Sequence, residues 1–336
     1  MELNTVSLSD FVSLVKVYWE KTKQSLAQEA LNSGIFIRED IPMNSGNIRQ
    51  HSEIDLNEYA RFKGEGAQSQ RAKQQQGYTK FVTSYRVSSD IGITYEMRTQ
   101  NKYPEVTRRL TNLSSQGYNR RELDLTHRLT FGTATAYTDM DGRSVDISIG
   151  DTLALFSTAH TLKGTTATYR NRLANNPKVS RGSIENLEAQ IVANTLNQFG
   201  EKVTIPFDII WTSDDPNTIN TVREFLRSTA SVDPGTNQGV INVYKGKYRH
   251  VVLPRLATDN LGQPDSTKAN YWGLASSMFS TAHLDVWEEP HLKVPENLNA
   301  GEEFSTDDWN FGVRAGYGIA IVNAQWIQFS SGDATP

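Results

Sequence analysis

The end of the chain carries its most hydrophobic segment. The run Phe311–Phe329 starts with spaced glycines and continues from Ile319 into a largely apolar stretch. A short apolar run bounded by turn residues is typical of a strand that is buried on both faces. The pattern predicts that the chain finishes by passing a hydrophobic strand back through its own core, which small enzymes rarely do.

The composition indicates a folded chain without covalent cross-links. The chain has 336 residues, of which 37% are hydrophobic, and is long enough for two or three packed units at about 150 residues each. Cysteine is absent, so disulfides and thiolate chemistry are excluded, and stability must come from burial and association. The formal net charge of -4 does not suit tight nucleic-acid binding, which requires a basic surface.

The N-terminal residues do not look like a targeting segment. They lack the basic-then-apolar order of a secretory signal peptide. No apolar run in the chain approaches the ~18 residues needed to cross a bilayer. We therefore expect the chain to be synthesised and folded in a cytoplasm, with no membrane among its partners.

A helix is predicted near the start of the chain. Ser9 and Asp10 can cap an amphipathic helix, and the apolar spacing that follows suggests that it runs to Asn32 and stops at Gly34. Beyond it, residues 41–46 form a polar, extended connection.

The segment 61–77 predicts the tip of a projecting hairpin. It contains one aromatic residue, Phe62, and no helical or strand periodicity. The flanking segments 54–59 and 78–87 have strand composition. Two strands joined by a long polar tip would form an arm, and an isolated hairpin is only marginally stable in water. The arm therefore needs a partner surface.

Two helices and a strand are predicted in the middle of the chain. Pro104 suits the first turn of a long helix that reaches about Ala134, with a kink at Gly117. A strand is predicted over 152–156. A second helix, capped by Ser183, is predicted over 183–199 and is ended by Gly200.

A compact unit of strands and one helix follows. Strand 207–211 precedes Asp215 and Pro216, which are typical of a helix cap and a first helical residue. The predicted buried face of this helix consists of Ile219, Val222, Phe225 and Leu226. Further strands are predicted at 240–244 and 248–253 around a tight turn at 245–247, and then at 271–275 and 283–287.

The sequence Phe-Ser-Thr-Ala-His occurs twice, at 156–160 and 279–283. A serine and a histidine could in principle form a pair for acyl transfer. Residues three apart on a strand point to opposite faces, however, and no Gly-x-Ser-x-Gly turn presents either serine. The favoured interpretation is that each segment is a strand end with polar residues where the chain leaves the strand. A hydrolase is kept as the enzyme alternative.

No other motif predicts a site of chemistry. Asp139–Gly142 begins like a calcium loop, but Ser144 stands where glycine is required and Gly150 where glutamate is required, so we expect a simple turn. The six histidines are scattered without metal-ligand spacing, and Gly316–Gly318 does not continue into a phosphate loop. We expect no catalytic residues, no bound metal and no cofactor.

Two stretches of opposite charge remain. From 61 to 80 there are five basic residues and one acidic residue, whereas 285 to 308 contains eight acidic residues and one basic residue. Such runs are commonly solvated faces. The alternative is that the basic arm lies on an acidic surface of a neighbouring subunit, where complementarity guides register. The candidate contact residues are Arg61, Lys63, Arg71, Lys73, Glu302, Glu303, Asp307 and Asp308.

The order of these elements, together with the segments 150–160, 208–216 and 311–329, resembles the major capsid protein of tailed bacteriophages. The pattern is closest to the major head subunit of Mu-like phages. The resemblance implies an α+β fold of the Hong Kong 97 type, with a long spine helix. By resemblance, the chain divides into an N-arm (1–46), an E-loop hairpin (47–90), a peripheral domain (91–205 with 278–336) and an axial domain (206–277).

The resemblance also implies a function. A protein of this family is structural and not an enzyme, and it assembles into hexamers and pentamers that form an icosahedral shell around phage DNA. Its expected partners are other copies of itself, a scaffolding protein (separate or removed), a portal, cementing proteins and weakly contacted double-stranded DNA. Its expected location is the virion, after assembly in the host cytoplasm. An encapsulin-type protein compartment shares this fold and stays a rival interpretation.

Overall fold

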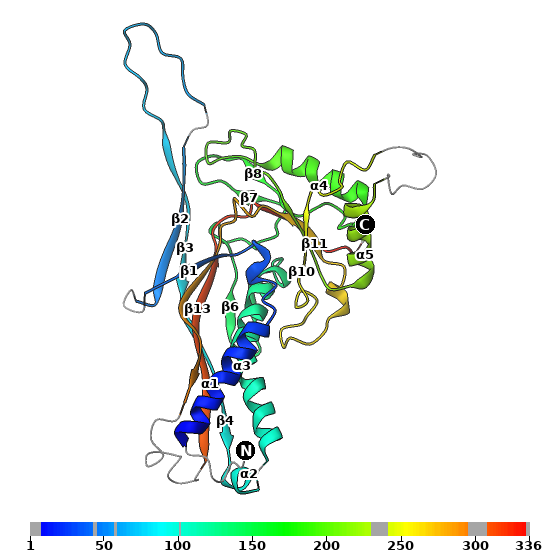
Figure 1. Cartoon of the computed structure of the whole chain (residues 1–336). Coiled ribbons are helices and arrows are strands. Elements are labelled where there is room, and N and C mark those ends of the chain that lie inside the picture. Colours follow the sequence, from blue (N-terminus) through cyan, green and yellow to red (C-terminus); the bar gives the residue numbers. More distant parts are fainter. Residues whose placement is uncertain are drawn as a thin grey trace.

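The computed structural model describes residues 8–42, 46–56, 59–100, 102–229, 241–294 and 308–333. Within these ranges the fold mixes helices with several sheets. Figure 1 shows a compact body, an elongated lower half formed by α1, α3, β4 and β13, and a hairpin that projects from the body.

The helices and strands have the following bounds. The helices are α1 (Leu8–Ser25), η1 (Leu31–Ser33), α2 (Tyr95–Thr99), α3 (Tyr103–Thr130), α4 (Arg181–Asn194), α5 (Pro216–Arg227) and η3 (Ser266–Lys268). The strands are β1 (Ile37–Asp40), β2 (Ile48–Leu56), β3 (Gln74–Thr83), β4 (Tyr85–Ile93), β5 (Ala136–Thr138), β6 (Ser144–Asp146), β7 (His160–Thr161), β8 (Thr168–Tyr169), β9 (Ile209–Thr212), β10 (Arg249–Val252), β11 (Trp272–Ala275), β12 (Ala282–Lys293), β13 (Trp309–Ile321) and β14 (Ile327–Ser330).

Two four-stranded sheets form the framework. The first has the order β1-β12-β13-β4, in which β1 is parallel to β12 and the other pairs are antiparallel. The helices α1 and α3 contact each other, and Phe11 of α1 packs against Trp309 and Phe311 of β13. The second sheet has the order β10-β9-β11-β14, and α4 and α5 share a hydrophobic cluster with it.

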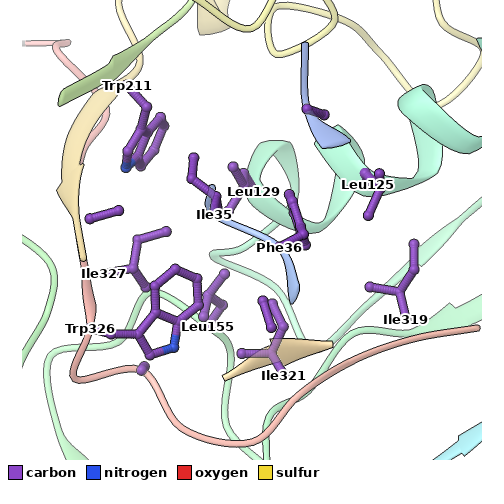
Figure 2. Close-up of a cluster of buried hydrophobic side chains, with 14 of the residues drawn as sticks. Ile35, Phe36, Leu125, Leu129, Leu155, Trp211, Ile319, Ile321, Trp326 and Ile327 are labelled. Atoms are coloured by element: carbon purple, nitrogen blue, oxygen red, sulfur yellow. The ribbon is translucent and has the colours of Figure 1, made fainter. Parts of the chain in front are cut away.

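The largest hydrophobic cluster joins segments from the whole length of the chain. Figure 2 shows Leu155 beside Trp326, Ile327 and Ile321 near the C-terminal end of the chain. Trp211 of β9 belongs to the same cluster and is fully buried. The C-terminal segment therefore runs through the core, as the sequence predicts.

The terminal apolar run is not one strand. It divides into β13 in the first sheet and β14 in the second. Between them the chain turns at Asn323, whose carbonyl accepts a hydrogen bond from the indole nitrogen of Trp326 at 2.9 Å. The prediction of a single strand from Ile319 to Phe329 is wrong because this turn is stabilised by contacts that the hydrophobic pattern does not reveal. The last strand consequently links the two sheets.

The first helix is shorter than predicted, because α1 ends at Ser25 and not at Asn32. The chain then enters η1, where the carboxylate of Glu122 on α3 accepts hydrogen bonds from the amides of Ala30 at 2.7 Å and Leu31 at 3.2 Å. These tertiary bonds replace the helical bonds of a longer α1. Gly34 does end this region, with a left-handed φ of 79°.

The long helix α3 is confirmed, with Pro104 in its first turn. The predicted kink at Gly117 is not seen as a break, because α3 is a single helix from Tyr103 to Thr130. The glycine instead allows a close approach: a Cβ at position 117 would lie 3.0 Å from Val313 and 3.2 Å from Pro290.

The helix α4 begins and ends earlier than predicted. Its N-cap is Ser180, and Ser183 is the third residue of a reciprocal capping box. The helix ends at Asn194, because Asn197 then accepts hydrogen bonds from the amides of Phe199 and Glu201, both at 2.9 Å. Gly200, with φ 78°, belongs to that turn and is not the helix end.

Two predicted strands are turns. In 152–156 the left-handed φ of 68° at Thr152 and the bond from the Leu153 amide to Asp151 produce successive turns. In the described part of 240–244, Ile241 and Val243 are exposed, and the side-chain amide of Asn242 donates to the Phe225 carbonyl at 2.6 Å. Val240 lies outside the described residues. The predicted turn at 245–247 is present, with φ 70° at Gly246.

The helix α5 matches its prediction. Asp215 is the N-cap and accepts a hydrogen bond from the Thr218 amide at 2.8 Å, and Pro216 is the first helical residue. Val222, Phe225 and Leu226 are buried, while Ile219 is partly buried. The cap and the apolar spacing are both local signals, which is why they suffice here.

Candidate functional site

The hairpin β2–β3 is the most exposed feature of the fold. The two strands are antiparallel, with Ile48 opposite Thr83 and Leu56 opposite Gln74, and the register shifts once between Ser52 and Ile54. Figure 1 shows the arm extending well beyond the body and ending in the long tip that joins the two strands. The predicted hairpin is therefore confirmed, although its strands start and end at different residues.

The outward face of this hairpin carries several large apolar side chains among polar ones. Along β2 the residues 48, 50, 52, 54 and 56 are exposed, and those between them are buried or half-buried. The exposed fractions are 60% for Ile48, 67% for Ile54 and 52% for Leu56, and Phe81 on β3 is 63% exposed. A sheet that faces water normally places its polar residues outward. We define these four side chains as the outward face.

The inward face is polar and attaches the arm to the body. The amide of Gln198 donates to the Asp55 carboxylate at 2.9 Å, and the Glu53 carboxyl is hydrogen bonded to Asn323 and Gln198. Burial, and then the charge of Asp55, raises the pKa of Glu53 to about 7. Specific polar contacts therefore hold the hairpin to the body, together with Val82 of β3, which is buried beside Gly318 of β13.

The second strand of the hairpin makes similar contacts. Lys80 Nζ lies 2.7 Å from the Asp146 carboxylate and donates to the Ser148 hydroxyl at 2.9 Å. The hydroxyls of Tyr78 and Thr161 are 2.7 Å apart. These bonds orient the arm, and they leave its outward face uncovered.

The predicted basic residues lie on the tip. Arg61, Lys63, Arg71 and Lys73 are all exposed, as is Phe62 between the first two. The sequence argument did not identify the outward face as a contact surface. The sequence does show apolar residues alternating with a charged residue at 54–56. This alternation was interpreted only as strand composition.

The predicted acidic residues are only partly within the described chain. Glu302, Glu303 and Asp307 lie outside the described residues, and Asp308 is half-buried directly before β13. The first residue of β13 pairs with Ile93, at the end of β4 away from the hairpin. Since β4 spans nine residues, Asp308 lies roughly 25 Å from the hairpin base. The structure does not bring Asp308 and the basic tip together within one chain.

The two Phe-Ser-Thr-Ala-His segments do not form Ser–His pairs. His160 is buried, its Nδ1 is 2.8 Å from Asp151, and its Nε2 is 3.2 Å from the Asn171 side chain. In the second segment Ser280 donates to the Ile35 carbonyl, while His283 lies 3.0 Å from Glu39. Each histidine thus contacts other partners, and His160 and His283 lie at or near the starts of β7 and β12.

The segment 139–142 is the simple turn that the sequence predicts. It joins β5 and β6, which pair as a hairpin. One carboxylate oxygen of Asp139 accepts hydrogen bonds from the amides of Asp141 at 3.0 Å and Arg143 at 2.9 Å. These bonds occupy the oxygen that a calcium ion would need.

A cleft of about 860 Å³ lies between α3, β4, β13 and the β5–β6 turn. Five arginines and two aspartates line it. Arg120 pairs with Asp124 at 3.1 Å and with Asp141 at 3.0 Å. Tyr317 donates to Asp124 at 2.6 Å, and burial raises the pKa of that carboxyl.

Folding brings together one group that could hold a metal. Glu39, His51 and His283 each place a potential ligand atom within 4.8 Å of the other two. They come from β1, β2 and β12, so spacing in the sequence gave no signal.

No helix in the described part of the chain is long and apolar enough to cross a bilayer.

Comparisons with known proteins give structural matches only. No family model matches the chain, and no curated protein does. Among solved structures, the capsid of Myoviridae phage XM1 is similar with a TM-score of 0.50 at 10% identity, covering 90% of this chain and 91% of that one. A chain from Mycobacterium phage Adephagia has a TM-score of 0.49 at 12% identity, covering 92% and 91%. A virus-like particle from Pyrococcus furiosus has a TM-score of 0.46 at 10% identity, covering 96% and 99%.

The phage XM1 match concerns the fold. It confirms the predicted α+β fold of the Hong Kong 97 type and the resemblance to phage capsid proteins at the level of structure. The closer likeness to the Mu-like head subunit stays a prediction.

Proposed function

We propose that this chain is a major capsid protein that assembles into hexamers and pentamers of an icosahedral shell around phage DNA. The observation that carries the proposal is the outward face of the hairpin: Ile48, Ile54, Leu56 and Phe81 are more than half exposed on an arm that projects from the body. Several large apolar side chains exposed on one projecting arm favour an interaction surface.

The energetics favour a second copy of the chain as the occupant. Burying a side chain of this size contributes roughly 1.5–3 kcal/mol, so four of them supply a substantial driving force for association. An arm that reaches from one subunit onto a different surface of the next makes a heterologous contact. Such contacts close into rings when the rotation between subunits is a whole fraction of a turn, as in hexamers and pentamers.

The proposed domains divide the helices and strands as follows. The N-arm (1–46) includes α1 and β1, and the E-loop (47–90) includes the hairpin and the first part of β4. The axial domain (206–277) includes β9, α5, β10 and β11. The peripheral domain (91–205 and 278–336) includes α3 as the spine helix, and its last strand, β14, pairs with β11 of the axial sheet.

The charged residues act as a guide for register in this proposal. The basic tip residues Arg61, Lys63, Arg71 and Lys73 meet an acidic surface of a neighbour that includes Glu302, Glu303, Asp307 and Asp308. The separation of Asp308 from the tip within one chain is in keeping with a contact between neighbours. Exposed charge pairs of this type select orientation more than they add affinity.

The proposal further makes the chain a virion component that is assembled in the host cytoplasm and has no enzymatic activity. A scaffolding protein, a portal and cementing proteins are the other proposed partners. DNA contact is weak and non-specific, in keeping with a net charge of -4.

Removing the apolar character of the outward face tests the proposal. We expect Ile54→Asp to leave far-ultraviolet circular dichroism and thermal unfolding nearly unchanged, because Ile54 is 67% exposed. Assembly, measured by light scattering and negative-stain electron microscopy with scaffold present, should be lost. Val192→Asp is the matched control, since Val192 is 59% exposed on α4, away from the hairpin.

Two results would contradict the proposal. Shells formed by Ile54→Asp with wild-type yield would exclude the outward face as a contact. A wild-type chain that stays a small soluble oligomer under all assembly conditions would exclude a capsid function and return attention to the hydrolase interpretation. Particles that enclose protein cargo instead of DNA would favour the encapsulin-type rival.

A further inference from the structure

Two histidines and a glutamate meet where the hairpin joins the body. Glu39 lies on β1, His51 on β2 and His283 on β12, and one ligand atom of each lies within 4.8 Å of the others. The rings of His51 and His283 are stacked, with centroids 4.0 Å apart and planes inclined by 16°. Nδ1 of His283 is 3.0 Å from Oε1 of Glu39.

These distances are close to those of a bound transition-metal ion. Imidazole nitrogens and carboxylate oxygens bind zinc at about 2.0–2.2 Å, so ligand atoms that share one ion lie roughly 3–3.5 Å apart. Glu39 and His283 already have this separation. The rings of His51 and His283 are nearly parallel, so the His51 ring must turn before its Nδ1 faces the same ion.

A second carboxylate orients one of the histidines. Asp285 is fully buried, and its Oδ2 lies 2.8 Å from Nε2 of His51. Its other oxygen, Oδ1, accepts no hydrogen bond from the described residues and has Arg49 Nη1 at 3.5 Å. Metal-binding histidines commonly give one ring nitrogen to such a carboxylate, which fixes the ring and raises its basicity.

We propose that Glu39, His51 and His283 bind a divalent transition-metal ion of the zinc class, with Asp285 as the residue that positions His51. Two imidazoles and a carboxylate favour zinc over calcium or magnesium, which prefer oxygen ligands. Arg49 bonds the second oxygen of Glu39 and is 35% exposed, so it can move away when a cation enters.

The ion would act as a clamp at the base of the arm. It would tie β2 of the hairpin to β1 and β12 of the body, which otherwise meet here through hydrogen bonds, ion pairs and the stacking of His51 on His283. Metal binding would therefore fix the angle at which the outward face is presented. This site does not depend on the proposed function, because it lies within a single chain.

Zinc binding to the unassembled full-length chain tests the inference. Protein stripped with a chelator and dialysed is titrated with zinc chloride by isothermal calorimetry, and cobalt chloride provides a visible absorption spectrum. We expect one ion per chain, a higher melting temperature with zinc than with chelator, and slower hydrogen exchange in β2. Glu39→Gln and His283→Asn should each weaken zinc binding by roughly 10- to 100-fold.

His291→Ala is the matched control. His291 is 44% exposed on the same strand, β12, with Nδ1 3.6 Å from the Glu288 carboxylate, and its loss should leave zinc binding unchanged. Glu39→Gln keeps the size of the side chain, so it remains informative if a histidine variant unfolds. Absence of saturable zinc binding by the wild type overturns the inference, as does equal affinity in Glu39→Gln and the wild type.

Discussion

Buried polar side chains of α3 hold segments that are distant in the sequence. Glu122 binds the amides of Ala30 and Leu31. His127 Nε2 lies 3.1 Å from the Thr258 hydroxyl, and Thr130 donates to the Leu256 carbonyl at 2.9 Å. Such polar side chains follow no periodic pattern in the sequence, because the tertiary fold and not the neighbouring residues determines their hydrogen-bond partners. Sequence reasoning accordingly predicted α3 but not what its polar residues do.

His127 makes stability depend on acidity. Burial is the main cause that lowers its pKa to about 4, from an ordinary value of 6.5. Between these values the unfolded chain binds the proton and the folded chain does not, so the free energy of unfolding rises with pH. We expect that moving from pH 6.5 to pH 4 costs about 3 kcal/mol through this residue.

Substitution of His127 measures this contribution. His127→Gln keeps a polar group near Thr258 and cannot be protonated, so its stability should fall less steeply over pH 6.5–4 than that of the wild type. Urea unfolding at several pH values gives the comparison. Parallel pH profiles for the two proteins would show that His127 is already charged in the folded state.

At the scale of elements, local signals were sufficient where several of them agreed, and tertiary contacts could not be predicted. The helix α5 was predicted because its cap, its proline and its apolar spacing all lie within twelve residues. The segment 319–329 was predicted as one strand, because composition cannot show that β13 and β14 belong to different sheets. The hairpin was predicted as an arm, but the exposed apolar side chains on its outward face became clear only when β2 could be seen against the body.

The cluster of Glu39, His51 and His283 could not have been predicted at this scale. Its members lie on three strands, two of them in one sheet and the third in the hairpin. Metal-ligand spacing is informative only when the ligands share an element. The sequence therefore gave no reason to single out these histidines.

The helix α5 provides a test of core assignment. Val222 is fully buried, so Val222→Asp places an unpaired charge in the cluster shared by α5 and the second sheet and should destabilise the protein by about 3–5 kcal/mol. Thr221→Asp introduces the same residue at an exposed position of the same helix and should cost less than about 1 kcal/mol. Thermal unfolding of both variants decides, and similar melting temperatures would contradict the assigned buried face.

At the scale of the whole molecule, the body and the arm differ in how far their apolar side chains are buried. The body contains large buried clusters, whereas the arm exposes its apolar face and carries a basic tip. A chain built in this way is stable as a folded subunit but has an unsatisfied surface. In the proposed function, association with further copies buries that surface without any change in the core.

The basic tip should influence assembly more than folding. Replacing Arg61, Lys63, Arg71 and Lys73 together by glutamine should leave thermal unfolding nearly unchanged, because exposed charges contribute little to stability. Shell yield should fall and become less sensitive to salt, since exposed charge pairs are screened over about 8–10 Å at moderate ionic strength. The measurement is shell yield against salt concentration, and identical curves for variant and wild type would mean that the tip is a solvated loop.

The most direct test of the central claim is electron cryomicroscopy of particles assembled from the wild-type chain. We predict an icosahedral shell of hexamers and pentamers in which Ile48, Ile54, Leu56 and Phe81 of each hairpin are buried against a neighbouring subunit. A shell in which these four side chains remain exposed to solvent, or particles without hexamers and pentamers, would contradict the account.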